Sequence, residues 1–150
     1  GYGLTAITFC DFVIASESAT FSYPEVRIGI PTIVRAIRLP QKLNWADAME
    51  LLLLGEPISS SRAKEIGLVW EVCNDDQLMS RAKELAGKLC KSAPLASRAT
   101  KEVATRTQNM GWIESVRFGE TMRIVANQTK DATEGKSAFR EKRDPDWKGK

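Results

Sequence analysis

The sequence predicts an α/β fold over residues 1–75, followed by a nearly all-helical part over residues 76–150. Short β-type runs alternate with helical patterns in the first part, whereas apolar spacing typical of helices dominates the second. Hydrophobic residues make up 43% of the chain and charged residues 27%, a composition that excludes intrinsic disorder and indicates a globular protein. No internal repeat or Gly/Ser-rich linker interrupts the chain.

Turn signals delimit the expected elements of the first part. Glycine or proline follows most helical patterns, and Asn or Ser stands where a helix should begin. These signals predict helices at residues 4–9, 32–39, 45–54 and 61–66, and strands at residues 12–15, 20–22 and 68–73. Pro40 is expected to end the second of these helices, and Gly55 the third.

Apolar residues at helical spacing predict the elements of the second part. Helices are expected at residues 77–90, 95–110, 112–126 and 137–142. The candidate core residues of the third of these helices are Ile113, Val116, Phe118, Met122 and Val125. Residues 133–136 should turn into the last helix, and the polar tail at residues 143–150 is expected to end in disorder.

Composition narrows the classes of chemistry. The chain has no histidine, which excludes Ser-His and Cys-His catalysis and the common histidine metal sites within it, and no metal site is expected. Its three cysteines lack CxxC spacing, which favours a reducing compartment, the cytoplasm or a mitochondrial matrix. No apolar run is long enough to span a membrane. The net charge of +3 comes without interleaved basic and aromatic residues, so no nucleic-acid partner is expected.

Two features near the start of the chain could carry chemistry. A Gly-Tyr-Gly turn before a helix leaves backbone N–H groups free to stabilise a carbonyl oxygen that becomes negative. Glu25, placed by the Pro24-Glu25 turn, could act as a general acid or base. Taken alone, the same residues are more typical of an ordinary helix-entry turn and of an exposed glutamate after a turn proline.

The order of motifs in this region resembles the enoyl-CoA hydratase/isomerase (crotonase) family. The pattern Gly-x-Gly, Cys-Asp, Ala-x-x-x-Ala-x-Phe, Pro-Glu-x-x-x-Gly is matched without a gap by Gly1, Gly3, Cys10, Asp11, Ala15, Ala19, Phe21, Pro24, Glu25 and Gly29. A second cluster is formed by Glu134, Gly135, Ala138, Phe139, Glu141, Lys142 and Arg143. The resemblance implies a crotonase-type ββα spiral followed by a helical trimerisation part. The chain starts inside the first motif, so the resemblance also implies that the family's N-terminal half is missing.

The resemblance assigns roles to particular positions. Glu25 matches the family's catalytic glutamate, and the backbone N–H of Tyr2 matches a donor of the oxyanion hole. Thr5 stands where hydratases of the family carry a second glutamate. Gly1, Gly3, Pro24, Arg35 and Lys142 are the expected substrate or CoA contacts, with Lys142 near the CoA phosphates.

Two departures from the family pattern bear on the reaction. Thr5 can form hydrogen bonds but cannot accept a proton at neutral pH, which puts hydration by two carboxylates in doubt. After Gly29 the family's Gly-rich segment is replaced by bulkier residues and by Arg35 and Arg38. Either arginine could pair with a substrate carboxylate. The alternative is that both are solvated residues on a helix surface.

The expected function is therefore the processing of an acyl-CoA thioester through an oxyanion-stabilised enolate, with Glu25 as the single acid/base in an isomerase-like reaction. Hydration of a 2-enoyl-CoA is the alternative reaction. A truncated, non-catalytic fragment for oligomerisation and CoA binding is the alternative without enzyme activity. No separate cofactor is expected, because coenzyme A is part of the substrate. The family implies a homo-oligomer, a trimer or a dimer of trimers, with no membrane partner.

Overall fold

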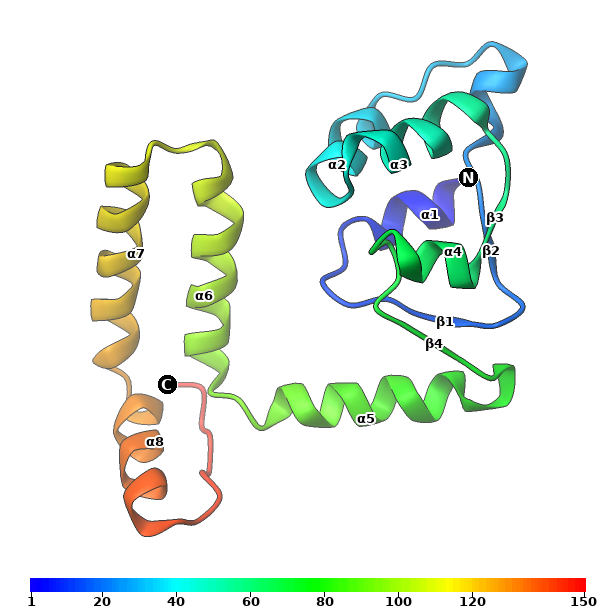
Figure 1. Cartoon of the computed structure of the whole chain (residues 1–150). Coiled ribbons are helices and arrows are strands. Elements are labelled where there is room, and N and C mark those ends of the chain that lie inside the picture. Colours follow the sequence, from blue (N-terminus) through cyan, green and yellow to red (C-terminus); the bar gives the residue numbers. More distant parts are fainter. The chain divides into compact units, whose positions relative to one another are not determined.

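The computed structural model describes all 150 residues, which form two compact units, Gly1–Glu84 and Leu85–Lys150 (Figure 1). Helix α5 (Leu78–Cys90) runs across this division. The sequence places the change from α/β to helical character earlier, at residue 75. The structure divides later because the start of α5 is tied to the first unit, where Arg81 Nε lies 2.6 Å from Glu71 Oε1.

The first unit contains short strands among short helices. Its elements are α1 (Tyr2–Ile7), β1 (Ile14–Ser16), β2 (Thr20–Phe21), the 3₁₀ helix η1 (Pro24–Ile28), α2 (Val34–Lys42), α3 (Trp45–Met49), the π-helical turn η2 (Glu50–Leu54), β3 (Ile58–Ser59), α4 (Ser60–Glu65), β4 (Glu71–Cys73) and the 3₁₀ helix η3 (Asp75–Gln77). Strands β1 and β4 pair in parallel, and β2 and β3 pair antiparallel. The strands expected from the sequence are present, but each is shorter than expected.

The hydrophobic core belongs to the first unit. Tyr23, Leu39, Leu51 and Val69 are almost completely buried in one cluster that draws on the helices and on the segments between them. Burying a side chain of this size contributes about 1.5–3 kcal/mol. The core therefore fixes the two segments, around Tyr23 and around Leu39, between which the candidate site lies.

The caps expected for two helices are confirmed. Asn44 Oδ1 accepts a hydrogen bond from the backbone N–H of Asp47 at the start of α3. Ser59 caps α4 in the same way through the N–H of Arg62. Gly55 ends the α3–η2 helix with φ of +64°, and a Cβ at this position would lie 3.1 Å from the carbonyl oxygen of Tyr23. Only glycine satisfies both the left-handed backbone and the close approach.

The expectation that Pro40 ends its helix is wrong. Helix α2 runs from Val34 to Lys42 with Pro40 inside it. A proline costs a helix one N–H donor, but residues beyond it can still donate. The N–H of Leu43 donates to the carbonyl of Leu39 over 2.8 Å, so the last turn closes around the proline.

The second unit is helical and its last helix begins earlier than expected. It contains the C-terminal half of α5, then α6 (Pro94–Arg106), the 3₁₀ helix η4 (Thr107–Asn109), α7 (Trp112–Asn127) and α8 (Lys130–Glu141). Thr129 caps α8 by accepting the N–H of Ala132. Gly135 therefore lies inside the helix, where a Cβ would approach the Trp147 ring to 3.1 Å. This glycine marks a close contact, not the turn that the sequence suggested.

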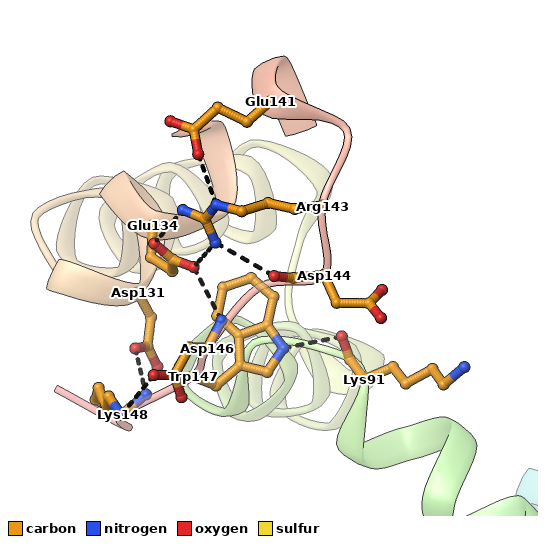
Figure 2. Close-up of polar contacts among 9 residues, drawn as sticks. All are labelled: Lys91, Asp131, Glu134, Glu141, Arg143, Asp144, Asp146, Trp147 and Lys148. Carbon is orange, nitrogen blue, oxygen red and sulfur yellow. Dashed lines mark hydrogen bonds and ion pairs between the residues drawn. The ribbon is translucent and has the colours of Figure 1, made fainter. Parts of the chain in front are cut away.

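The C-terminal tail, expected to end in disorder, is instead fixed by a network of contacts (Figure 2). The buried Asp131 carboxylate accepts the backbone N–H groups of Lys148 and Gly149, each over 2.8 Å. Glu134 pairs with Arg143 and accepts the N–H of Asp146. The Trp147 indole N–H donates to the carbonyl of Lys91 over 2.9 Å. We call residues 143–150 the C-terminal strap.

The expected core of the second unit is wrong at three of its five residues, whereas Phe118 and Met122 are partly buried. Ile113, Val116 and Val125 are exposed, as are Trp112 and Phe139, and Ala138 is the one hydrophobic residue buried in this unit. Large exposed apolar side chains are typical of interaction surfaces when they form a continuous patch. None of the helices combines the length and the apolar character that a membrane span requires.

The strap is expected to loosen at low pH. The Arg143 guanidinium, together with the backbone N–H of Asp146, lowers the pKa of Glu134 from 4.5 to about 2. A lowered pKa stabilises the folded strap fully above pH 4.5, and this contribution is lost as the pH falls toward 2. The indole N–H resonance of Trp147, assigned with Trp147→Phe, should report the release. The idea fails if Glu134→Gln leaves the titration of this resonance unchanged.

Candidate active site

Four residues from three segments of the first unit meet at the candidate site. Thr5 lies on α1, Tyr23 and Glu25 lie at the start of η1, and Arg35 lies in the first turn of α2. Pro24 begins η1, where its missing N–H costs no hydrogen bond. We call Thr5, Tyr23, Glu25 and Arg35 the Glu25–Arg35 site.

The end of η1 keeps Glu25 in place. Gly29 has φ of +76°, a left-handed conformation that favours glycine, and it reverses the chain after the 3₁₀ turn. The N–H of Ile30 then donates to the carbonyl of Glu25 over 3.0 Å. The Pro-Glu-x-x-x-Gly motif is therefore a closed turn with the glutamate at its beginning.

An ion pair occupies the centre of this site. Arg35 Nη1 lies 2.8 Å from Glu25 Oε1, and the side chains are only 13% and 19% exposed, respectively. The other carboxylate oxygen, Oε2, is buried without a hydrogen-bond partner. A charge pair so far withdrawn from water interacts much more strongly than a surface pair, because solvent screens it little.

Arg35 also contacts Thr5, the position at which the resemblance implies a second glutamate in hydratases. Its Nε donates to Thr5 Oγ1 over 2.5 Å. The guanidinium therefore bridges Thr5 and Glu25. This geometry excludes, for Arg35, the interpretation as a solvated residue on a helix surface.

Tyr23 completes the site and was not singled out from the sequence. It is fully buried, and the guanidinium carbon of Arg35 lies 4.9 Å from the centre of its ring, within the range of a cation–π interaction. Burial raises the pKa of Tyr23 to about 12, against the opposing effect of the Arg35 charge. The Tyr23 hydroxyl is buried without a hydrogen-bond partner. The nearby Thr5 side chain acts against the rise in its pKa. The sequence could have pointed to Tyr23 only through its position, as an aromatic residue directly before Pro24-Glu25.

The expected oxyanion donor lies on α1, one turn before Thr5. Tyr2 is the first residue of the helix, so its N–H has no acceptor within α1. A Cβ added to Gly1 or Gly3 would meet nothing within 4 Å, which leaves open space around the turn. The Tyr2 side chain is 88% exposed. The backbone N–H of Tyr2 and the hydroxyl of Thr5 therefore both belong to the short helix α1.

Two further candidates lie away from this cluster. Arg38 directs its guanidinium over the Phe9 ring, 5.1 Å from the centre, and donates to Gln41. Lys142 caps the end of α8 in the second unit with φ of +54° and is exposed. The structure therefore brings Thr5, Glu25 and Arg35 together and leaves Arg38 outside the ion pair.

Comparison with known proteins identifies the family. The family model described as enoyl-CoA hydratase/isomerase matches residues 1–150. The chain belongs to the enoyl-CoA hydratase/isomerase family. The fold expected from the resemblance is confirmed by a crystal structure of an enoyl-CoA hydratase/isomerase from Mycobacterium paratuberculosis, which is 38% identical with a TM-score of 0.94, over 100% of this chain and 60% of that one.

Other proteins named as enoyl-CoA hydratases or as related acyl-CoA enzymes are similarly close to this chain. An enoyl-CoA hydratase from Bacillus anthracis is 34% identical with a TM-score of 0.91, over 95% of this chain and 56% of that one. A relative named carnitinyl-CoA dehydratase, from Salmonella agona, is 37% identical and is matched by 100% of this chain over 59% of its own length. The chain thus spans about 59% of the length of the curated relatives it matches.

Proposed function

We propose that the protein acts on an acyl-CoA thioester through an enolate, with Glu25 as its single acid/base. The observation that supports this best is the Glu25–Arg35 site itself. The glutamate of the family motif is present and partly enclosed, whereas Thr5 and a guanidinium occupy the place of a second carboxylate. A single carboxylate is enough to move a proton between carbons. Holding an attacking water in place as well would require a second carboxylate, which this site lacks.

In the proposed proton transfer, Glu25 and the Tyr2 N–H act in turn. A Glu25 oxygen takes a proton from the carbon next to the thioester carbonyl, and the electrons of that C–H bond form a carbon–carbon double bond. The carbonyl π electrons move to its oxygen, which becomes negative and accepts the Tyr2 N–H. Such a donor is worth about 3 kcal/mol at the transition state. In a 3-enoyl-CoA the enolate is conjugated with the existing double bond, so Glu25 can return the proton to the far carbon of that bond while the carbonyl re-forms. The double bond then lies next to the carbonyl, which completes the shift.

A second candidate is the removal or addition of water at an acyl-CoA. It is favoured by the relatives named carnitinyl-CoA dehydratase. In this reaction Glu25 would remove the proton next to the carbonyl and pass it to the hydroxyl group on the neighbouring carbon. That group would leave as water while the carbonyl re-forms and a carbon–carbon double bond appears. The fragment alternative, oligomerisation and CoA binding without turnover, rests on the exposed apolar side chains of α7.

Contacts to the CoA moiety and the oligomeric state are part of the same proposal. Gly1 and Gly3 would let the thioester approach the Tyr2 N–H, and Pro24 would border the acyl group. Lys142, exposed at the end of α8, would attract a CoA phosphate. A homo-oligomer, a trimer or a dimer of trimers, would cover the exposed Trp112 and Ile113.

Product analysis in heavy water separates these candidates. The protein as encoded, with any sequence that precedes Gly1, is incubated with a 2-enoyl-CoA and with a 3-enoyl-CoA, and the products are read by mass spectrometry. We expect deuterium in a product with a shifted double bond. A 3-hydroxyacyl-CoA would favour the hydration candidate. Unchanged substrate without deuterium, together with detectable CoA binding, would favour the fragment alternative.

A further inference from the structure

We propose that Arg35 selects acyl groups that carry a carboxylate, and that this carboxylate releases Glu25 by replacing it on the guanidinium. The inference rests on the proposed function and names its substrate class, a thioester of a dicarboxylic acid. It starts from a conflict within the site. The group expected to accept a proton is already engaged in an ion pair that is largely withdrawn from water.

The contacts of the two partners are unequal. Arg35 is held by Thr5 through Nε and by the face of the Tyr23 ring, in addition to Glu25. The Glu25 side chain has Arg35 as its one ion-pair partner, and its Oε2 has no hydrogen bond. When a competing anion arrives, the guanidinium therefore stays in place and Glu25 is the group that moves.

The guanidinium can receive such an anion. The contacts to Thr5 and Glu25 use Nε and Nη1 and leave Nη2 outside them. A carboxylate binds a guanidinium best through two parallel N–H···O bonds, a geometry available at Nη1 and Nη2 once Glu25 has left. When Glu25 is displaced, the incoming carboxylate takes its place as the negative partner of Arg35, so that the guanidinium is not left buried and unpaired.

A neutral acyl group gives no such compensation. Glu25 then remains on Arg35, with its Oε1 held 2.8 Å from Nη1, and is not free to reach the proton next to the carbonyl. A cationic acyl group would add repulsion by Arg35 to this effect. Proton removal should therefore be fastest for anionic acyl groups and slowest for cationic ones.

Three thioesters of similar length test this order. Exchange of the proton next to the carbonyl is measured by mass spectrometry in heavy water for glutaryl-CoA, pentanoyl-CoA and trimethylammoniobutyryl-CoA. Binding of each is measured by calorimetry. We expect glutaryl-CoA to exchange about 30-fold faster than pentanoyl-CoA, since losing one partner of a buried charge pair costs at least about 2 kcal/mol.

Two variants separate selection by charge from a structural role. Arg35→Met keeps an unbranched side chain but removes the charge, so glutaryl-CoA should exchange more slowly while pentanoyl-CoA exchanges faster, because Glu25 is no longer held. Arg38→Met, on the same helix but outside the ion pair, should keep the preference of the wild type. A merely structural role would slow all three thioesters together.

The outcomes bear on the two proposals differently. Equal exchange of glutaryl-CoA and pentanoyl-CoA, or a preference that survives Arg35→Met, would overturn the role of Arg35 and leave the proposed function standing. Absence of exchange with all three thioesters would overturn the proposed function and this inference with it. A reversal of the preference by Arg35→Met, with none by Arg38→Met, would establish the inference.

Discussion

Glu25→Gln should slow proton exchange next to the thioester carbonyl by about 10²–10⁴-fold, the usual contribution of a positioned general base. The amide has nearly the same shape and can still accept a hydrogen bond from Arg35, so the fold around η1 should persist. It cannot accept the proton, because its oxygen is far less basic than a carboxylate. The rate in heavy water, followed by mass spectrometry, measures the effect directly.

A matched control comes from another Glu–Arg pair of the same unit. Glu56 pairs with Arg27 over 2.7 Å but lies on the surface, and Glu56→Gln should leave the exchange rate within about twofold. Comparable losses in Glu25→Gln and Glu56→Gln would mean that general damage, not loss of the base, explains the result. Full exchange in Glu25→Gln would contradict the proposed role of Glu25.

Asp131→Ala should destabilise the second unit by about 3 kcal/mol, because hydrogen bonds to a charged group contribute about 1.5–3 kcal/mol each. The buried carboxylate accepts two backbone N–H groups of the strap, each over 2.8 Å (Figure 2). Asp131→Asn keeps one acceptor oxygen but turns an N–H₂ group toward the second donor. Its loss should therefore be intermediate. Urea unfolding, followed by the indole N–H resonance of Trp147, measures both variants.

The same strap supplies the control for this prediction. The exposed Asp144 takes part in the network through its backbone carbonyl, which accepts an Arg143 N–H. Asp144→Ala keeps that carbonyl and should cost less than about 0.5 kcal/mol, as expected for a surface substitution. An equal loss for Asp131→Ala and Asp144→Ala would show that the Asp131 carboxylate does not hold the strap.

Local signals made the elements of the first unit predictable. Asn44, Gly55 and Ser59 act within one turn of the chain, so the sequence alone identifies the helix ends that they set. Pro40 misled because its effect depends on the residues after it, which can continue to donate to the helix. Gly135 misled for a related reason, since the Trp147 ring that requires it comes from the strap.

The candidate site was predictable only in part. The family motif identifies Glu25, and the departure after Gly29 draws attention to Arg35. Their ion pair could not be predicted, because it depends on how α2 lies against η1. Tyr23 was missed for the same reason, since a tyrosine acquires its role only through the charge placed over its ring. The predicted core of the second unit was wrong at Ile113, Val116 and Val125, because helical spacing shows which face is apolar but not what covers it.

The hydrogen bond between Trp147 and Lys91 has a consequence for the order of folding. The helices of the second unit can form from neighbouring residues, and such local contacts develop quickly. The bond joins residues 56 positions apart, so its loop-closure entropy is offset only after the intervening helices have become compact. The C-terminal strap therefore attaches late in folding. A chain whose folding is interrupted before this step would have formed helices in the second unit but an unattached strap.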